Sequence, residues 1–157
     1  MPHTRPDMTE FVHLTLPARP AHLCALRREV ARWLAALPMS QDRREEVVLA
    51  VGEAAANSVE HAYDPAEAGV VELTFWTESG ALCVEVSDRG RWREPPLPAR
   101  GQPGQGGLGL VLMRRLIDCV LIHHDSRGTK VLLRHPIAGP APDARRVLLT
   151  APGVDPG

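Results

Sequence analysis

The sequence predicts an α+β fold, a two-layer sandwich in which helices pack on one face of a β-sheet. Two observations predict it. Segments with strand and helix periodicity follow one another as strand, helix, helix, hairpin, loop, helix and two strands. The strands come in runs instead of alternating singly with helices, which disfavours a doubly wound parallel sheet. With 157 residues, 44% of them apolar, the chain suffices for one domain with a substantial core.

The first part of the chain is predicted to form a strand and two helices. Alternating apolar residues over 11–16 indicate a half-buried strand. Apolar residues at helical spacing indicate an amphipathic helix over 21–37, which Pro38 ends. Ser40 is the expected N-cap of the second helix, which Asp64-Pro65 closes. The predicted buried residues of that helix are Val47, Val51, Ala54, Ala55, Val59 and Ala62.

The rest of the chain is predicted to contain a hairpin, a long loop, a helix and two strands. The hairpin comprises 70–77 and 82–87, joined at Glu78-Ser79-Gly80, and the later elements are a helix over 108–117 and strands over 119–124 and 130–134. Prolines and glycines fill the loop over 91–106, and a loop of that length usually has a role such as a lid. From residue 135 onward Pro, Gly and Ala predict a flexible tail, in which Val147-Leu148-Leu149 could dock as an edge strand.

Charge and composition disfavour several classes of protein. The net charge is −1 with no basic block, so neither direct nucleic-acid binding nor an anionic membrane surface is expected. No apolar stretch reaches the length of a membrane span, and no signal peptide is recognisable. Cys24, Cys83 and Cys119 lie far apart in apolar runs, which predicts buried thiols in a reducing compartment. We therefore expect a soluble cytoplasmic protein.

Glu53 and Asn57 form the first candidate for chemistry. They are four residues apart on a predicted helix, so their side chains share one face, among small residues that leave room for a ligand. A carboxylate can activate a nucleophile, and a neutral amide oxygen can hold Mg²⁺ beside a nucleotide. The pair alone also fits an ordinary solvated helix face. His61, one turn further on, lacks the second His or Cys that a zinc site needs and is expected to make a local hydrogen bond.

Two further motifs follow in order. Asp88-Arg89-Gly90 ends a predicted strand, where a carboxylate can accept a hydrogen bond from an exocyclic amine and a glycine allows close approach. An ordinary Asp-x-Gly turn is the alternative. The glycine cluster over 104–109 leads into a helix whose free amides could bind phosphate, although it could also be a flexible loop. It matches neither the P-loop nor the dinucleotide fingerprint.

In this order the three motifs resemble the N, G1 and G2 boxes of the histidine-kinase-like ATPases, the GHKL superfamily. The small single-domain branch of anti-sigma-factor serine/threonine kinases is the most similar. The stretches that carry the resemblance are EAAANSVEHAY over 53–63, VSDRG over 86–90, GLGLVLM over 107–113 and RGTKV over 127–131. The resemblance implies a mixed, mostly antiparallel sheet. It divides the chain into an N-terminal extension over 1–9, an ATP-binding domain over 10–134 and the flexible tail over 135–157.

The resemblance also implies a role for each matching residue. Asn57 would coordinate Mg²⁺, and Glu53 would be the general base. Asp88 would accept a hydrogen bond from the adenine amine, with Gly90 beneath the ring. The remaining implied cofactor-binding residues are Gly106, Gly107, Leu108 and Gly109 at the phosphates, and Thr129 at the adenine side.

The implied function is an ATP-dependent protein kinase of the anti-sigma-factor type. It would phosphorylate a serine or threonine of an anti-anti-sigma (STAS-type) partner and sequester a sigma factor, and a homodimer is compatible with the resemblance. The proline-rich lid over 92–106 lacks the lysine that some members place against the terminal phosphate; Arg91, Arg93 or Arg100 could supply the charge. The alternative is therefore a partner-switching module that binds ATP with little phosphotransfer. A plainer alternative is a small domain whose glycines only form turns.

Overall fold

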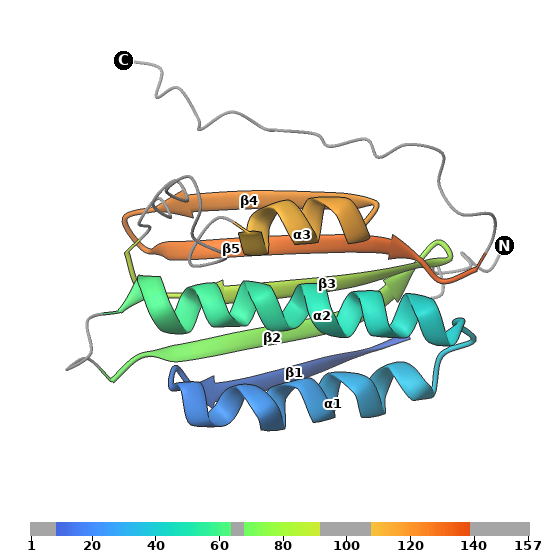
Figure 1. Ribbon diagram of the computed structural model, residues 1–157, viewed down its shortest axis with the longest axis horizontal. Helices are drawn as coiled ribbons and strands as arrows, with labels where there is room; N and C mark the ends of the chain where they lie inside the picture. The colour runs from blue at the N-terminus through green and yellow to red at the C-terminus, as the bar shows by residue number, and fades with distance from the viewer. Residues whose placement is uncertain (1–8, 64–67, 92–107, 139–157) are drawn as a thin grey trace, which may run out of the picture.

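The computed structural model describes residues 9–63, 68–91 and 108–138 of the chain. Its elements are β1 (Thr9–Pro17), η1 (Pro20–His22), α1 (Leu23–Ala35), α2 (Gln41–Asn57), η2 (Ser58–Ala62), β2 (Val70–Glu78), β3 (Ala81–Asp88), α3 (Leu108–Leu116), β4 (Cys119–Asp125) and β5 (Gly128–Pro136). The strands form one sheet in the order β1-β2-β3-β5-β4 (Figure 1).

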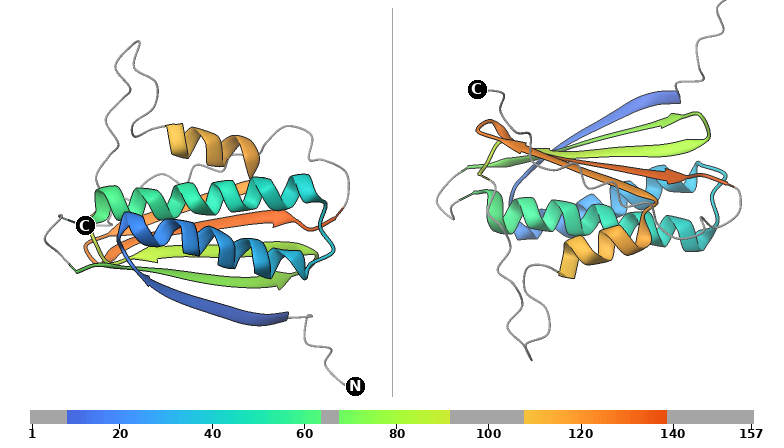
Figure 2. Two further views of the ribbon diagram at one scale, coloured as in Figure 1. Left: turned by 60° about the horizontal axis from the view of Figure 1, so that its bottom comes forward. Right: turned by 90° about the horizontal axis from the view of Figure 1, so that it is seen from above.

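Helices and sheet form two layers, and the helices lie together on one face of the sheet (Figure 2). The predicted α+β sandwich is therefore confirmed. The sheet was expected to be mixed and mostly antiparallel, and all four described strand pairs are antiparallel. An antiparallel sheet can have helices on one face only. In the described ranges all helices lie on the same face (Figure 2), so each strand alternates between side chains that face the helices and side chains that face away.

The core lies between the helices and the inner face of the sheet. Apolar residues that recur at helical spacing on α1 and α2 meet alternate residues of the central strands, as binary patterning requires. Trp33 on α1 packs against Phe75 on β2, with ring centroids 4.9 Å apart. The buried set includes Leu26, Val30, Leu34, Val47, Val51, Ala54, Leu73, Phe75, Val84, Val86, Val131 and Leu133.

The hairpin between β2 and β3 forms where it was predicted. Its two-residue turn consists of Ser79 with φ 49° and Gly80 with φ 74°. Positive φ at both central positions is the geometry of the tight turns whose twist matches that of the flanking strands. The register then pairs Glu78 with Ala81 and continues to Val71 opposite Asp88, so the turn determines which residue ends the hairpin near the candidate site.

The helix boundaries follow local chemistry. Pro20 begins a 3-10 turn, η1, so α1 starts two residues later than the predicted 21. The predicted N-cap of α2 is confirmed, because Ser40 Oγ accepts a hydrogen bond from the backbone N–H of Arg43 at 3.3 Å. Asp42 lies in the first turn of α2, where its negative charge is favourable.

The cysteine prediction was wrong for Cys24. The core face of α1 is formed by Leu26, Val30 and Leu34, and Cys24 lies about half a turn away from it, on the exposed side. Cys83 is buried and Cys119 is partly buried, and all three are free thiols. Burial raises the pKa of the Cys83 thiol, which keeps it protonated at neutral pH.

Several predictions fall on residues outside the described ranges. They are the lid over 92–106, the glycines before residue 108 and the part of the predicted tail after residue 138, with its proposed edge strand. The side chain of His61, and with it the predicted hydrogen bond, is not described either. In the ranges that the structure does describe, no helix is both long and apolar enough to cross a membrane.

Candidate functional site

Glu53 and Asn57 lie on one flank of α2, and both side chains are partly buried. The opposite flank of α2 packs against α1. Val48 marks this flank, since it lines one groove together with Ala31 of α1. At about 100° per residue, Glu53 and Asn57 therefore point away from α1. The third helix, α3, also packs against α2 (Figure 2). The candidate base and metal ligand thus lie on the α3 side of α2, as one pair.

The end of α2 changes geometry directly after Asn57. Residues Ser58–Ala62 form η2, a π-helix. A π turn holds an extra residue and is frequent at functional sites, because it re-aims the backbone groups that follow. In this protein the carbonyl of Ala62 accepts a hydrogen bond from the backbone N–H of Arg91 at 2.7 Å. The segment after the candidate metal ligand is therefore bonded to the segment after β3.

Asp88 ends β3 and is buried, with 7% of its surface exposed. Ser58 Oγ donates a hydrogen bond to Asp88 Oδ2 at 2.7 Å, and the backbone N–H of Gly90 donates to Asp88 Oδ1 at 3.1 Å. Each carboxylate oxygen thus has one donor, as a buried charge requires. The Ser58 bond joins residues 30 positions apart and brings Asp88 next to the end of α2.

Gly90 allows a close approach, but the group that approaches is the protein's own backbone. A Cβ at this position would lie 2.0 Å from the carbonyl oxygen of Ala62. No side chain can be accommodated there without moving η2 away from β3. Gly128, at the start of β5, is similarly crowded by the carbonyl of Asp88, at 1.9 Å from an ideal Cβ, and has φ +143°. Both glycines therefore allow three chain segments to meet around Asp88.

Thr129 lies directly opposite Asp88 in the β3–β5 register and is buried. Its predicted place on the adenine side thus adjoins that of Asp88. Of the predicted phosphate-binding residues, Leu108 and Gly109 are the first two residues of α3, whose helix start is confirmed. Gly106 and Gly107 lie outside the described ranges. Glu53, Asn57, Asp88, Gly90 and Thr129 are brought into one region, and their individual roles stay predictions.

Two residues of this region were not among the predicted site residues. Ser58 bonds Asp88, and Tyr63 Oη accepts a hydrogen bond from the backbone N–H of Arg89 at 2.9 Å while donating to the carbonyl of Val70 at 2.8 Å. Ser58 carried a signal, because it lies four residues after Ala54 on the predicted buried stripe, where a polar side chain needs a partner. No pattern in the sequence indicated the two bonds of Tyr63.

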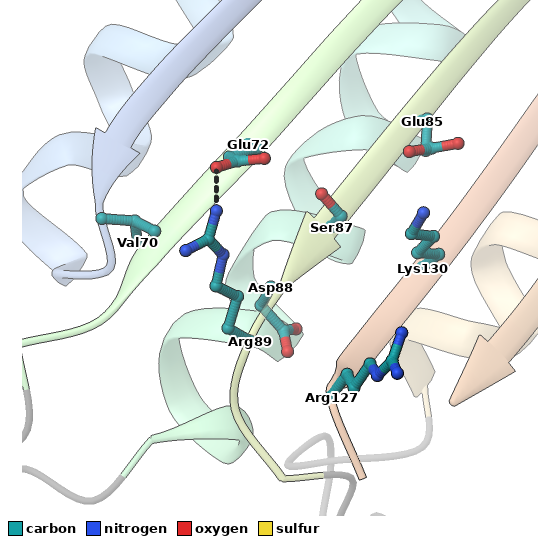
Figure 3. A pocket seen from close by; sticks show the side chains of 8 residues that line it. All are labelled: Val70, Glu72, Glu85, Ser87, Asp88, Arg89, Arg127 and Lys130. Atoms are coloured by element: carbon teal, nitrogen blue, oxygen red, sulfur yellow. Dashed lines mark ion pairs between the residues drawn. The ribbon is translucent and has the colours of Figure 1, made fainter. Parts of the chain in front are cut away.

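A polar hollow of about 360 Å³ lies behind Asp88 on the helix-free face of the sheet (Figure 3). Its lining includes Glu72, Ser87 and Lys130, which alternate with inward-facing neighbours and so point away from the helices. Arg89 reaches across it to Glu72 at 3.6 Å. Asp88 also lines this hollow, whereas its carboxylate bonds Ser58 at the end of α2, on the helix side of the sheet.

The sequence matches the histidine kinase-like ATPase domain over residues 16–135, which is most of the chain. The chain belongs to that family. It is 32% identical over 133 residues to the serine-protein kinase RsbW of Halalkalibacterium halodurans, covering 78% of this chain and 81% of that protein. It is 27% identical over 139 residues to the anti-sigma F factor of Geobacillus kaustophilus, covering 83% of this chain and 95% of that protein.

Solved structures agree with this family. The RsbU and RsbW domains of Rv1364c from Mycobacterium tuberculosis match with a TM-score of 0.67 and 26% identity. The match covers 85% of this chain, which spans about a third (34%) of that longer protein. The histidine kinase domain from Erythrobacter litoralis matches in fold, with a TM-score of 0.50 at 22% identity.

The residues of this histidine kinase-like ATPase domain fit a magnesium nucleotide. Magnesium usually binds one or two protein groups and takes its other ligands from phosphate and water. One amide oxygen, from Asn57, beside the Glu53 carboxylate fits that pattern. In the described part of the chain, no group of three or more His, Cys, Asp or Glu could hold a metal alone. Asp88 has about four acceptor positions, of which two are used, so it can still accept from an amine.

Proposed function

We propose that this protein is an ATP-dependent serine/threonine kinase of the anti-sigma-factor type. It phosphorylates an anti-anti-sigma (STAS-type) partner and sequesters a sigma factor when that partner is unavailable. The observation that carries the proposal is the Ser58–Asp88 hydrogen bond. It joins the helix bearing Glu53 and Asn57 to the end of β3, where the Asp88 carboxylate is expected to bind the adenine amine. The names of the relatives, a serine-protein kinase and an anti-sigma factor, support the partner classes.

The proposed reaction is in-line phosphoryl transfer from ATP to the partner's hydroxyl. The Glu53 carboxylate takes the hydroxyl proton while the oxygen forms a bond to the γ-phosphorus and the bond to the ADP oxygen breaks. Bound Mg²⁺ would neutralise phosphate charge, with Asn57 as its protein ligand. Asp88 and Thr129 orient the base, so that the γ-phosphate is presented on the α3 side of α2. Positioning supplies most of the catalysis in such transfers.

The test is incubation of the purified protein with labelled ATP, Mg²⁺ and candidate STAS-type partners. Glu53→Gln should lower transfer by about 10²- to 10⁴-fold, the usual contribution of a general base, while ATP binding measured by calorimetry persists. Glu78→Gln, at an exposed hairpin position, is the matched control and should transfer normally. Transfer by Glu53→Gln at the wild-type rate would remove Glu53 from the role of base.

A second candidate function is a binding module in which ATP sets partner affinity with little transfer. The absence of lysine from the sequence between residues 92 and 106 favours it. Calorimetry and mass spectrometry separate the two functions. If the protein is a binding module, calorimetry should show that ATP binds and changes the affinity for the partner. Mass spectrometry should then detect no phosphorylated form of any partner that binds.

The partner surface is proposed to be the groove between α1 and α2, which has a volume of about 480 Å³. Its apolar lining consists of Ala31, Ala35, Val48 and Leu49, of which Val48 is partly buried and the other three are exposed. Arg27 lines the groove and makes no ion pair or hydrogen bond in the described part of the chain. Arg44 and Glu45 also line the groove, but both are bonded within the protein, to backbone carbonyls and to Gln41. The charge of Arg27 therefore favours an amphipathic helix of the sigma factor that carries a carboxylate. A homodimer stays a prediction, and sedimentation equilibrium checks it.

A further inference from the structure

Ser58 is a buried hydroxyl that the proposed transfer does not use. Only 6% of its surface is exposed, and it follows Asn57 at the first position of η2. Its oxygen lies 2.7 Å from Asp88 Oδ2 and 3.4 Å from the carbonyl oxygen of Ala54. A serine has one proton to donate, and the shorter distance and the charged acceptor assign that proton to Asp88.

The two donors to Asp88 fix the plane of its carboxylate. Gly90 holds Oδ1 through its backbone N–H and Ser58 holds Oδ2 through its hydroxyl. The terminal torsion of an aspartate is broad, so one donor alone leaves the carboxylate free to turn. The second donor therefore determines where the unused acceptor positions point. A correctly oriented acceptor distinguishes an amine, which donates, from a carbonyl, which repels it.

The position of Ser58 is itself fixed by neighbouring contacts. The backbone N–H of Arg91 is bonded to Ala62, and that of Arg89 to Tyr63, so η2 and the segment after β3 are attached at successive points. The close approach of Gly90 to Ala62 leaves little room for relative movement. Loss of the Ser58 hydroxyl alone would thus leave the backbone in place and free only the Asp88 carboxylate.

We propose that Ser58 is a positioning residue that sets base specificity by orienting the Asp88 carboxylate toward a purine with an exocyclic amine. The inference rests on the proposed function, in which Asp88 accepts a hydrogen bond from the exocyclic amine of adenine. It predicts selection for ATP against inosine triphosphate, which carries a carbonyl where adenine carries its amine. Ser58 acts through Asp88 and does not itself contact the base.

The experiment measures binding of ATP and of inosine triphosphate, each with Mg²⁺, by calorimetry on the full chain. Wild type should prefer ATP. Ser58→Ala should lower ATP affinity about tenfold, in line with loss of a hydrogen bond to a charged group, while changing affinity for inosine triphosphate less than twofold. Ser58→Thr keeps the hydroxyl and should restore the preference. Ser87→Ala makes the same chemical change beside Asp88 on the other face of the sheet and should behave as wild type.

The ratio of the two affinities separates specificity from a structural effect, because partial unfolding lowers both affinities equally. An unchanged ratio in Ser58→Ala overturns the inference and leaves the proposed function standing, provided that wild type prefers ATP. Failure of wild type to bind either nucleotide overturns both. If Ser58→Ala does not fold, Ser58→Cys, with a thiol of similar size that donates weakly, should show a reduced ratio. A wild-type ratio in that variant also overturns the inference.

Discussion

At the scale of single residues, Gly90 is the position with the least tolerance for change. Its missing side chain lets the chain after β3 lie against the carbonyl of Ala62, and the next residue, Arg91, bonds that carbonyl. The glycine is therefore needed for contact between two parts of the protein, before any ligand is considered. Gly90 would affect nucleotide binding indirectly, because it determines the position of Asp88, two residues earlier.

Gly90→Ala should destabilise the fold and weaken ATP binding. The new methyl group overlaps the Ala62 carbonyl, and relief of that overlap should cost about 2 kcal/mol of unfolding free energy and separate Asp88 from Ser58. Gly80→Ala is the control, because Gly80 has positive φ but open space around it. It should cost about 1 kcal/mol of backbone strain and leave ATP affinity unchanged. Urea denaturation and calorimetry check both, and equal ATP affinities in the two variants would contradict this account.

The sequence predicted the residues of the site better than the contacts between them. Glu53 and Asn57 could be paired because helical spacing is local, and Asp88 could be placed at a strand end by the residues beside it. The bond from Ser58 to Asp88 spans 30 positions and depends on the π turn of η2. No local pattern predicts where a helix takes an extra residue, so only the structure could pair these two side chains.

At the scale of elements, the connection between η2 and β3 depends on one phenol. Tyr63 Oη joins the N–H of Arg89 to the carbonyl of Val70, which begins β2. The residue just beyond η2 is thus attached to both strands of the hairpin. Gly69 allows this, because a Cβ there would lie 2.4 Å from the tyrosine ring.

Tyr63→Phe should loosen the end of the hairpin without removing the ring. Two backbone groups lose their partner, and the unfolding free energy should fall by about 1 kcal/mol. Hydrogen exchange at the Arg89 amide should become faster, and ATP should bind more weakly because Arg89 adjoins Asp88. Thr74→Val removes an exposed bond to His13 on the other face of the sheet and should change neither exchange at Arg89 nor ATP affinity. Unchanged exchange at Arg89 in Tyr63→Phe would contradict the proposed attachment.

At the scale of the whole molecule, His135 links three elements. It lies buried on β5, its Nδ1 accepts a hydrogen bond from the backbone N–H of Asp118 before β4, and its Nε2 faces Glu46 of α2 at 3.3 Å. Burial lowers the pKa of His135 below its ordinary value of 6.5, and the nearby Arg43 lowers it further, while Glu46 and Asp118 oppose the shift. The neutral ring suits these contacts, because a protonated Nδ1 could not accept from Asp118.

The stability of the protein should therefore fall in mild acid. Above pH 6.5 His135 is neutral in both states. As the pH falls below 6.5 the unfolded chain takes up the proton first, so the folded state loses stability until the lowered pKa of the folded protein is passed. His135→Gln, which can keep both contacts and does not titrate, should lose less stability between pH 7 and pH 5.5. Urea denaturation at a series of pH values measures the unfolding free energy of both proteins. An equal loss of unfolding free energy between pH 7 and pH 5.5 in wild type and His135→Gln would exclude His135 as the cause.

The strand order also belongs to the whole molecule, and the sequence could predict it only in part. The β2–β3 hairpin followed from its turn, and the two-layer class followed from the run of elements. The insertion of β5 between β3 and β4 joins distant segments, and no turn residue specifies it. That pairing places Thr129 opposite Asp88, so the geometry of the candidate site depends on the long-range part of the topology.

The placement of the helices separates the proposed docking groove from the candidate nucleotide site, on opposite flanks of α2. Arg27→Ala should weaken binding of the sigma factor about tenfold, because a guanidinium that lines the groove without an ion pair in the described part of the chain is suited to a carboxylate of the partner. Arg32→Ala is the matched control, since Arg32 is already bonded to Glu29 on the exposed side of α1 and does not line the groove. Affinities measured by calorimetry at low and high salt should differ most for wild type, because the charge pair is screened. Equal losses in the two variants would mean that the net charge of α1, and not the groove, attracts the partner.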